Sequence, residues 1–231
     1  METPDNVILP PRIPKHHGRR RWTIIAGAAL GALVVASVPI CLRVFVVQPF
    51  RVPTNTMAPT IQGVTKLANG RTQVGDHIFV DKLSYRLRAP RRGEIVVFRT
   101  DRLKLLPKSA LGKYYVKRIV GLPGERVGIR PPFVYVNNQR ITEPRILATI
   151  ANGDRGYGGF LLPDCFGVVK PLLCAETNSV QLGKDEYFVL GDNQIASLDS
   201  RYWGAVPRKS IVGRVIAIYW PPERAGIPFA G

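Results

Sequence analysis

Few residues in this 231-residue chain can support hydrolytic chemistry. Of its three histidines, His16 and His17 precede a long apolar stretch, which leaves only His77 for the rest of the chain. A nucleophile activated by histidine and aspartate is therefore not expected. The sequence also has no Cys/His cluster at metal-ligand spacing and no glycine-rich phosphate loop. A hydrolase would need a hydroxyl nucleophile and a different base, and lysine is the available base because burial lowers its pKa.

Four segments carry the residues of such a site. They are PFRVPTNTMAPTI at 49–61, GDHIFVDKLSYRLRAPRRGEIVVF at 75–98, YYVKRIVGLPGE at 114–125 and YFVLGDNQIASLDSRYWGAVPRKSIVGR at 187–214. In this order and spacing they closely resemble the type I signal peptidases, membrane-anchored serine proteases that remove signal peptides from exported preproteins. The resemblance extends from the apolar stretch to about Tyr219.

This resemblance implies a role for each matching residue. Thr56 occupies the position of the nucleophile, and Lys117 occupies that of the general base. Thr54 would contribute to an oxyanion hole with the backbone N–H of Thr56, and Ser197 would hydrogen-bond and orient the lysine. Supporting positions match Met57, Pro59, Asp192, Asp199 and Arg201. The resemblance implies neither a cofactor nor a metal ion.

Two departures from the family pattern bear on activity. The usual Ser-x-Ser-Met is Thr54-Asn55-Thr56-Met57 here, and Gln194 replaces the arginine of GDNR. Threonine keeps the nucleophilic oxygen, but its methyl group restricts χ1 and crowds the attack trajectory. These departures are compatible with a slower enzyme and with a non-catalytic relative. The presence of Lys117 and its partners favours catalysis.

The apolar stretch before these motifs has the length of a membrane helix. Residues 23–42 carry no charge, and twenty helical residues can cross the hydrocarbon core of a bilayer. Five basic residues precede it, so the positive-inside rule places the N-terminus in the cytoplasm and the rest of the chain outside. The alternatives are a cleavable signal after Val34-Val35-Ala36 and a lipoprotein signal ending at Cys41. A retained single-pass anchor in the cell membrane is favoured because the apolar run exceeds a usual signal core.

The net charge of +17 alone suggests nucleic acid, an anionic membrane or acidic partners. Residues 1–43 hold six basic and two acidic side chains, which leaves +13 on the exported part. Because that part lies outside the cytoplasm, we expect it to face anionic lipid headgroups rather than nucleic acid.

The exported part has the composition of strands, so we expect a mainly β, antiparallel catalytic domain. The clearest strand segments are 77–80, 94–99, 114–120, 133–136, 186–190 and 211–220. Alternation places Lys117 on the face of Tyr115 and Ile119. The expected domains are a cytoplasmic tail at 1–22, an anchor at 23–43, a catalytic core at 44–125 and 185–231, and an insertion or flap at 126–184. Within the insertion, Cys165 and Cys174 either form a disulfide or remain free thiols.

These observations leave three functions. The first is a signal peptidase that cleaves exported preproteins after small-x-small sites. The second is a non-catalytic, membrane-anchored relative that binds preproteins or a partner. The third is a maturation peptidase with a narrower set of substrates. Three of the supporting residues also have a purely structural interpretation. Asp199 and Arg201 can form a structural ion pair, and Asp192 can be a turn residue.

Overall fold

The computed structural model describes residues 25, 27, 29–33, 35–37, 46–103, 105–130, 132–143, 145–152, 179–193 and 196–228. The chain divides into two units, Met1–Leu42 and Arg43–Gly231. The described residues of the first unit are helical. No helix among the described residues combines the length and apolar character needed to cross a bilayer. About half of the anchor expected at 23–43 lies outside the described residues, so the anchor stays a prediction.

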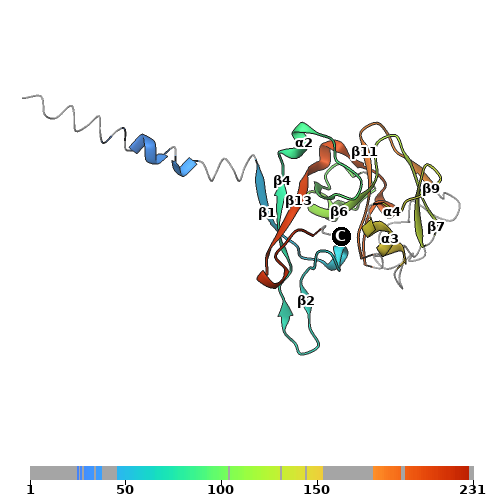
Figure 1. Ribbon diagram of the computed structural model, residues 1–231, viewed down its shortest axis with the longest axis horizontal. Coiled ribbons are helices and arrows are strands. Elements are labelled where there is room, and N and C mark those ends of the chain that lie inside the picture. Colours follow the sequence, from blue (N-terminus) through green and yellow to red (C-terminus); the bar gives the residue numbers. More distant parts are fainter. Residues whose placement is uncertain are drawn as a thin grey trace, which may run out of the picture. The chain divides into compact units, whose positions relative to one another are not determined.

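A seven-stranded sheet forms the centre of the second unit (Figure 1). Its strand order is β1-β4-β13-β5-β6-β11-β12, and all paired strands are antiparallel. The strands are β1 (Val47–Arg51), β4 (His77–Asp81), β13 (Ile211–Trp220), β5 (Ile95–Arg99), β6 (Tyr114–Gly121), β11 (Glu186–Leu190) and β12 (Val206–Pro207). The mainly β, antiparallel fold predicted from the sequence is confirmed.

In the described part of this unit, two smaller antiparallel sheets accompany the large one. One has the order β10-β7-β8-β9, with β10 (Ser179–Gln181), β7 (Arg126–Arg130), β8 (Phe133–Val136) and β9 (Gln139–Arg140). The other is a hairpin of β2 (Thr65–Lys66) and β3 (Thr72–Gln73). Asn137 and Asn138 both have positive φ in the β8–β9 turn, a conformation that asparagine tolerates.

The described helices of this unit are short. The α-helices are α2 (Ser84–Leu87), α3 (Arg145–Asn152) and α4 (Ser200–Trp203). The 3-10 turns are η1 (Asn55–Met57), η2 (Lys108–Ala110), η3 (Arg208–Ser210) and η4 (Pro222–Arg224).

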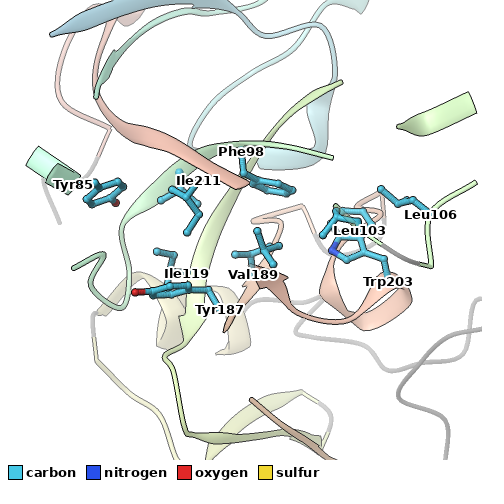
Figure 2. Close-up of a cluster of buried hydrophobic side chains, with 11 residues drawn as sticks. Tyr85, Phe98, Leu103, Leu106, Ile119, Tyr187, Val189, Trp203 and Ile211 are labelled. Atoms are coloured by element: carbon cyan, nitrogen blue, oxygen red, sulfur yellow. The ribbon is translucent and has the colours of Figure 1, made fainter. Parts of the chain in front are cut away.

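The large sheet is buried on both faces. Along β5, Ile95 and Val97 belong to one hydrophobic cluster, and Val96 and Phe98 belong to another. This two-sided burial explains why β5 is continuously apolar in sequence. The second cluster, shown in Figure 2, consists of Tyr85, Val96, Phe98, Leu103, Leu106, Ile119, Tyr187, Val189, Trp203, Val206 and Ile211.

The four-stranded sheet packs against the β6 and β11 end of the large sheet through a third cluster. The large sheet contributes Val120 and Phe188 to this cluster, and the four-stranded sheet contributes Val127 and Val134. Helix α3 contributes Leu147. The described part of the expected insertion therefore has a core shared with the main sheet. Cys165 and Cys174 lie outside the described residues.

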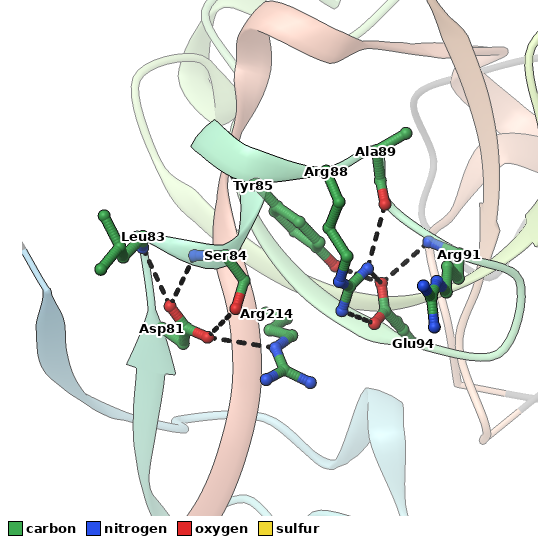
Figure 3. Close-up of polar contacts among 9 residues, drawn as sticks. All are labelled: Asp81, Leu83, Ser84, Tyr85, Arg88, Ala89, Arg91, Glu94 and Arg214. Carbon is green, nitrogen blue, oxygen red and sulfur yellow. Dashed lines mark hydrogen bonds and ion pairs between the residues drawn. The ribbon is translucent and has the colours of Figure 1, made fainter.

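Two carboxylates fix the turns that link the strands (Figure 3). Asp81, at the end of β4, accepts hydrogen bonds of 2.9 Å from the backbone N–H groups of Leu83 and Ser84. It also accepts a 3.2 Å bond from Arg214 Nε, which joins β4 to β13. Glu94, directly before β5, accepts hydrogen bonds from Tyr85, Arg88 and Arg91. These bonds attach the α2 segment to the ends of β4 and β5.

Candidate active site

The predicted nucleophile lies in η1, the single 3-10 turn after β1. Thr54 precedes the turn in an extended conformation (φ −127°, ψ 152°), and its side chain makes no capping hydrogen bond. Met57 is fully buried in the cluster that also contains Ile61 and Val52. The buried methionine therefore anchors a turn in which Thr56 is only half-buried.

Strand β6 brings the predicted base to this turn. Lys117 Nζ donates a 2.8 Å hydrogen bond to Thr56 Oγ1 and a 3.0 Å bond to the backbone oxygen of Val116. Nζ also lies 5.7 Å from the centroid of the Tyr115 ring, as the alternation of β6 predicts. The structure thus brings Thr56 and Lys117 into direct contact.

The environment of Lys117 disfavours its charged form. The residue is 2% exposed, and this burial lowers the pKa of its amine from 10.5 to about 8. The carboxylates of Asp199 and Asp192 oppose this shift, whereas the guanidinium of Arg201 adds to it. About a tenth of the amine is then neutral at pH 7, and a neutral amine can accept a proton.

Both neighbouring carboxylates are paired with buried arginines. Arg118 donates to Asp192 through Nε at 2.8 Å and through Nη2 at 2.5 Å, and its Nη1 bonds the backbone oxygen of Gly93. Arg201 donates to Asp199 from Nε and Nη2, both at 2.8 Å. All four side chains are nearly inaccessible to solvent. Removal of either member of a pair would therefore leave a buried charge without its partner.

Ser197 lies against the nucleophile turn but does not bond the lysine. A Cβ built on Gly191 would lie 2.1 Å from Ser197 Oγ and 2.5 Å from the backbone oxygen of Thr56, so the three residues pack closely. Ser197 is 1% exposed, and its Oγ has no hydrogen-bond partner among the described residues. The hydrogen bond to Lys117 that the resemblance implies is therefore not formed in this structure.

The remaining predicted positions surround the turn. Thr54 is exposed, directly before η1. Pro59 follows the turn, and its backbone oxygen accepts a 3.5 Å bond from Arg224 Nη2. Gln194 lies outside the described residues. Within the described part of the chain, no three His, Cys, Asp or Glu side chains gather as metal ligands would.

Known proteins resemble this chain over most of its length. The family model described as signal peptidase, peptidase S26, matches residues 20–220. The probable signal peptidase I-2 of a Synechocystis species is 35% identical over 207 residues, which cover 89% of this chain and 77% of the relative. Signal peptidase I of Bacillus caldolyticus is 32% identical over 214 residues, which cover 91% and 95% of the two chains.

The chain belongs to the signal peptidase family. Its relatives are named signal peptidase I, so the resemblance inferred from the four motifs is confirmed. This signal peptidase differs from the usual family motif at both hydroxyl positions, because Thr54 and Thr56 replace the usual serines.

Two residues that contact the nucleophile turn, Asn193 and Gly191, were not among the predicted site residues. Asn193 donates two hydrogen bonds to backbone oxygens of the turn. Its backbone N–H donates to the carbonyl oxygen of Thr56 at 3.1 Å, and its Nδ2 donates to the carbonyl oxygen of Asn55 at 3.0 Å. Gly191 provides the close approach to Ser197. Both belong to the GDN segment of the fourth motif, in which the resemblance implies a site role for Asp192 alone.

Proposed function

We propose that this chain is a membrane-bound endopeptidase that removes N-terminal signal peptides from exported preproteins. Cleavage would follow small-x-small sites, with Thr56 as the nucleophile and Lys117 as the general base. The observation that carries the proposal is the 2.8 Å hydrogen bond between a fully buried lysine and a hydroxyl placed in a signal peptidase motif.

The proposed reaction has two stages. Neutral Lys117 takes the proton of Thr56 Oγ1 as this oxygen attacks the scissile carbonyl carbon. The resulting lysine ammonium then gives the proton to the leaving amine, the C–N bond breaks, and the signal peptide remains attached to Thr56 as an ester. In the second stage Lys117 takes a proton from a water molecule as the water oxygen attacks the ester carbonyl carbon. The lysine ammonium then returns the proton to Thr56 Oγ1 as the ester bond breaks, which releases the signal peptide and restores the hydroxyl and the neutral amine.

The oxyanion formed in each stage needs hydrogen-bond donors. The backbone N–H of Thr56 and the hydroxyl of Thr54 are the proposed donors, because Thr54 directly precedes η1 and its hydroxyl makes no capping bond. Ser197 is proposed to support the lysine from the packed side of the turn, where its Oγ is buried. Asp192, Asp199 and Arg201 are proposed to tune the charge around Lys117.

Membrane attachment is part of the proposal. The charge-free residues 23–42 and the basic residues before them support a single-pass anchor with a cytoplasmic N-terminus. The anchor would hold the site near the bilayer, where the cleavage sites of signal peptides emerge. The exported part carries a net charge of +13, which favours contact with anionic lipids.

The test is cleavage of a preprotein with an Ala-x-Ala site by the full chain in detergent, with the product N-terminus read by mass spectrometry. We expect cleavage directly after this site. Thr56→Ser should retain or raise the rate, whereas Thr56→Val, which removes only the hydroxyl function, should abolish it. A wild-type chain that binds the preprotein without cleaving it would favour the non-catalytic relative instead.

A further inference from the structure

Asn55, the residue before the proposed nucleophile, has no assigned role in the motif but is extensively hydrogen-bonded. Its Nδ2 donates to Thr65 Oγ1 at 2.7 Å, and its Oδ1 accepts from the backbone N–H of Gly63 at 2.7 Å. Its backbone oxygen accepts the 3.0 Å bond from Asn193 Nδ2. Asn55 therefore joins the turn of Thr56 to two other segments of the chain.

One of these segments is the base of the β2–β3 hairpin, which projects from the second unit (Figure 1). The backbone N–H of Val64 donates to Pro53 O at 3.3 Å. Gly63 is buried, and a Cβ there would lie only 2.2 Å from the carbonyl carbon of Thr54. The base of the hairpin is thus packed directly against the residues that precede the nucleophile, and the amide of Asn55 fastens the two together.

The turn itself is weakly held by its own backbone. It is a single 3-10 turn without a side-chain cap, and such turns have poor hydrogen-bond geometry. Because threonine is restricted at χ1, the direction of Thr56 Oγ1 follows the local backbone more closely than a serine hydroxyl would. A side chain that holds this backbone in place therefore also keeps Thr56 Oγ1 directed at Lys117 Nζ.

We propose that Asn55 is a positioning residue for this site, a proposal that rests on Thr56 acting as the nucleophile. By bonding Thr65 and Gly63, it couples the β2–β3 hairpin to the nucleophile turn and keeps Thr56 Oγ1 directed at Lys117. Its contribution is to kcat rather than to substrate binding.

The test compares Asn55→Ala, Thr65→Val and the double variant in the cleavage assay. Misplacement of a reacting atom by about 1 Å costs about 100-fold, so we expect kcat to fall by about 10- to 100-fold with KM within about two-fold. The double variant should be no worse than Asn55→Ala, since both changes break the same link. Thr65→Ser, which keeps the hydroxyl, should retain activity. Gln73→Ala is the matched control. Gln73 lies on the same hairpin, but its 3.4 Å hydrogen bond goes to Gln62 and not to the nucleophile turn.

Hydrogen–deuterium exchange of the full chain provides a readout independent of cleavage. Backbone amides at 54–58 should exchange faster in Asn55→Ala and Thr65→Val than in Gln73→Ala. Unchanged exchange, or an unchanged kcat in an active enzyme, would overturn the role of Asn55. Absence of cleavage by the wild-type chain would instead overturn the proposed function, and the exchange comparison would still decide whether Asn55 braces the turn.

Discussion

Lys117 Nζ and Thr56 Oγ1 lie 2.8 Å apart although 61 positions separate the two residues in the sequence. β6 presents the lysine from the large sheet, and η1 presents the hydroxyl from a turn anchored by Met57. The bond from Asn193 to the backbone oxygen of Thr56 attaches the same turn to the segment after β11. The contact is therefore a product of the tertiary fold, and several consequences can be measured.

Activity should rise with pH until the lysine is largely neutral. Burial lowers the pKa of Lys117 to about 8, and only its neutral form can accept the proton of Thr56. Between pH 6 and 7, kcat/KM should increase about tenfold, and it should level off above the pKa. A pH–rate profile of the wild-type chain checks this. A profile that is flat between pH 6 and 8 would contradict the role of Lys117 as the base.

The buried lysine should reduce stability at neutral pH. Its pKa is about 8 in the folded chain and near 10.5 in the unfolded chain, so the unfolded state binds more protons between these values. Stability therefore rises with pH across this window. Lys117→Met should increase the free energy of unfolding at pH 7 by up to about 3 kcal/mol, and the gain should vanish near pH 11. Denaturant unfolding of both chains measures this, with exposed Lys113→Met as the control.

Gly191 should not tolerate a side chain. A Cβ at this position would lie 2.1 Å from Ser197 Oγ and 2.5 Å from Thr56 O, so Gly191→Ala must displace the nucleophile turn or the serine. We expect a loss of stability of about 1–3 kcal/mol and a fall in kcat of at least about tenfold. In Gly183→Ala the nearest atom is the flexible carboxylate of Glu186 at 3.0 Å, so that control should stay close to wild type.

The ion pair between Arg224 and Asp76 should stabilise the segment that follows the nucleophile turn. Arg224 of η4 donates to the fully buried Asp76 through Nε at 2.8 Å and Nη2 at 2.9 Å, and Nη2 also bonds Thr60 O at 3.2 Å. Arg224→Ala leaves this carboxylate without its cation and should cost about 1–3 kcal/mol of stability. The pair Arg99–Asp101 is exposed, so Arg99→Ala should change stability by less than about 1 kcal/mol. Equal losses of stability in Arg224→Ala and Arg99→Ala would contradict the larger contribution expected of the buried pair.

Much of the main sheet could be predicted from sequence, because its strands bury apolar side chains in runs or alternation. The same alternation predicted the inward face of Lys117. Burial of Arg118 could not be predicted, since its partner Asp192 lies 74 positions away and only the fold shows that the pair is inaccessible. Two other features depend on tertiary packing and could not be predicted from a local sequence pattern. They are the two-residue strands β2 and β3 and the absence of a hydrogen bond between Ser197 and Lys117.

The most direct measurement of the central claim is kcat/KM for Ala-x-Ala precursor cleavage by Lys117→Ala, with Lys113→Ala as the matched control. Both changes remove a lysine from the β6 region, but only Lys117 touches Thr56 Oγ1. The hydroxyl–lysine mechanism predicts that Lys117→Ala loses cleavage entirely while Lys113→Ala cleaves at the wild-type rate. Cleavage by Lys117→Ala at the wild-type rate would contradict the mechanism.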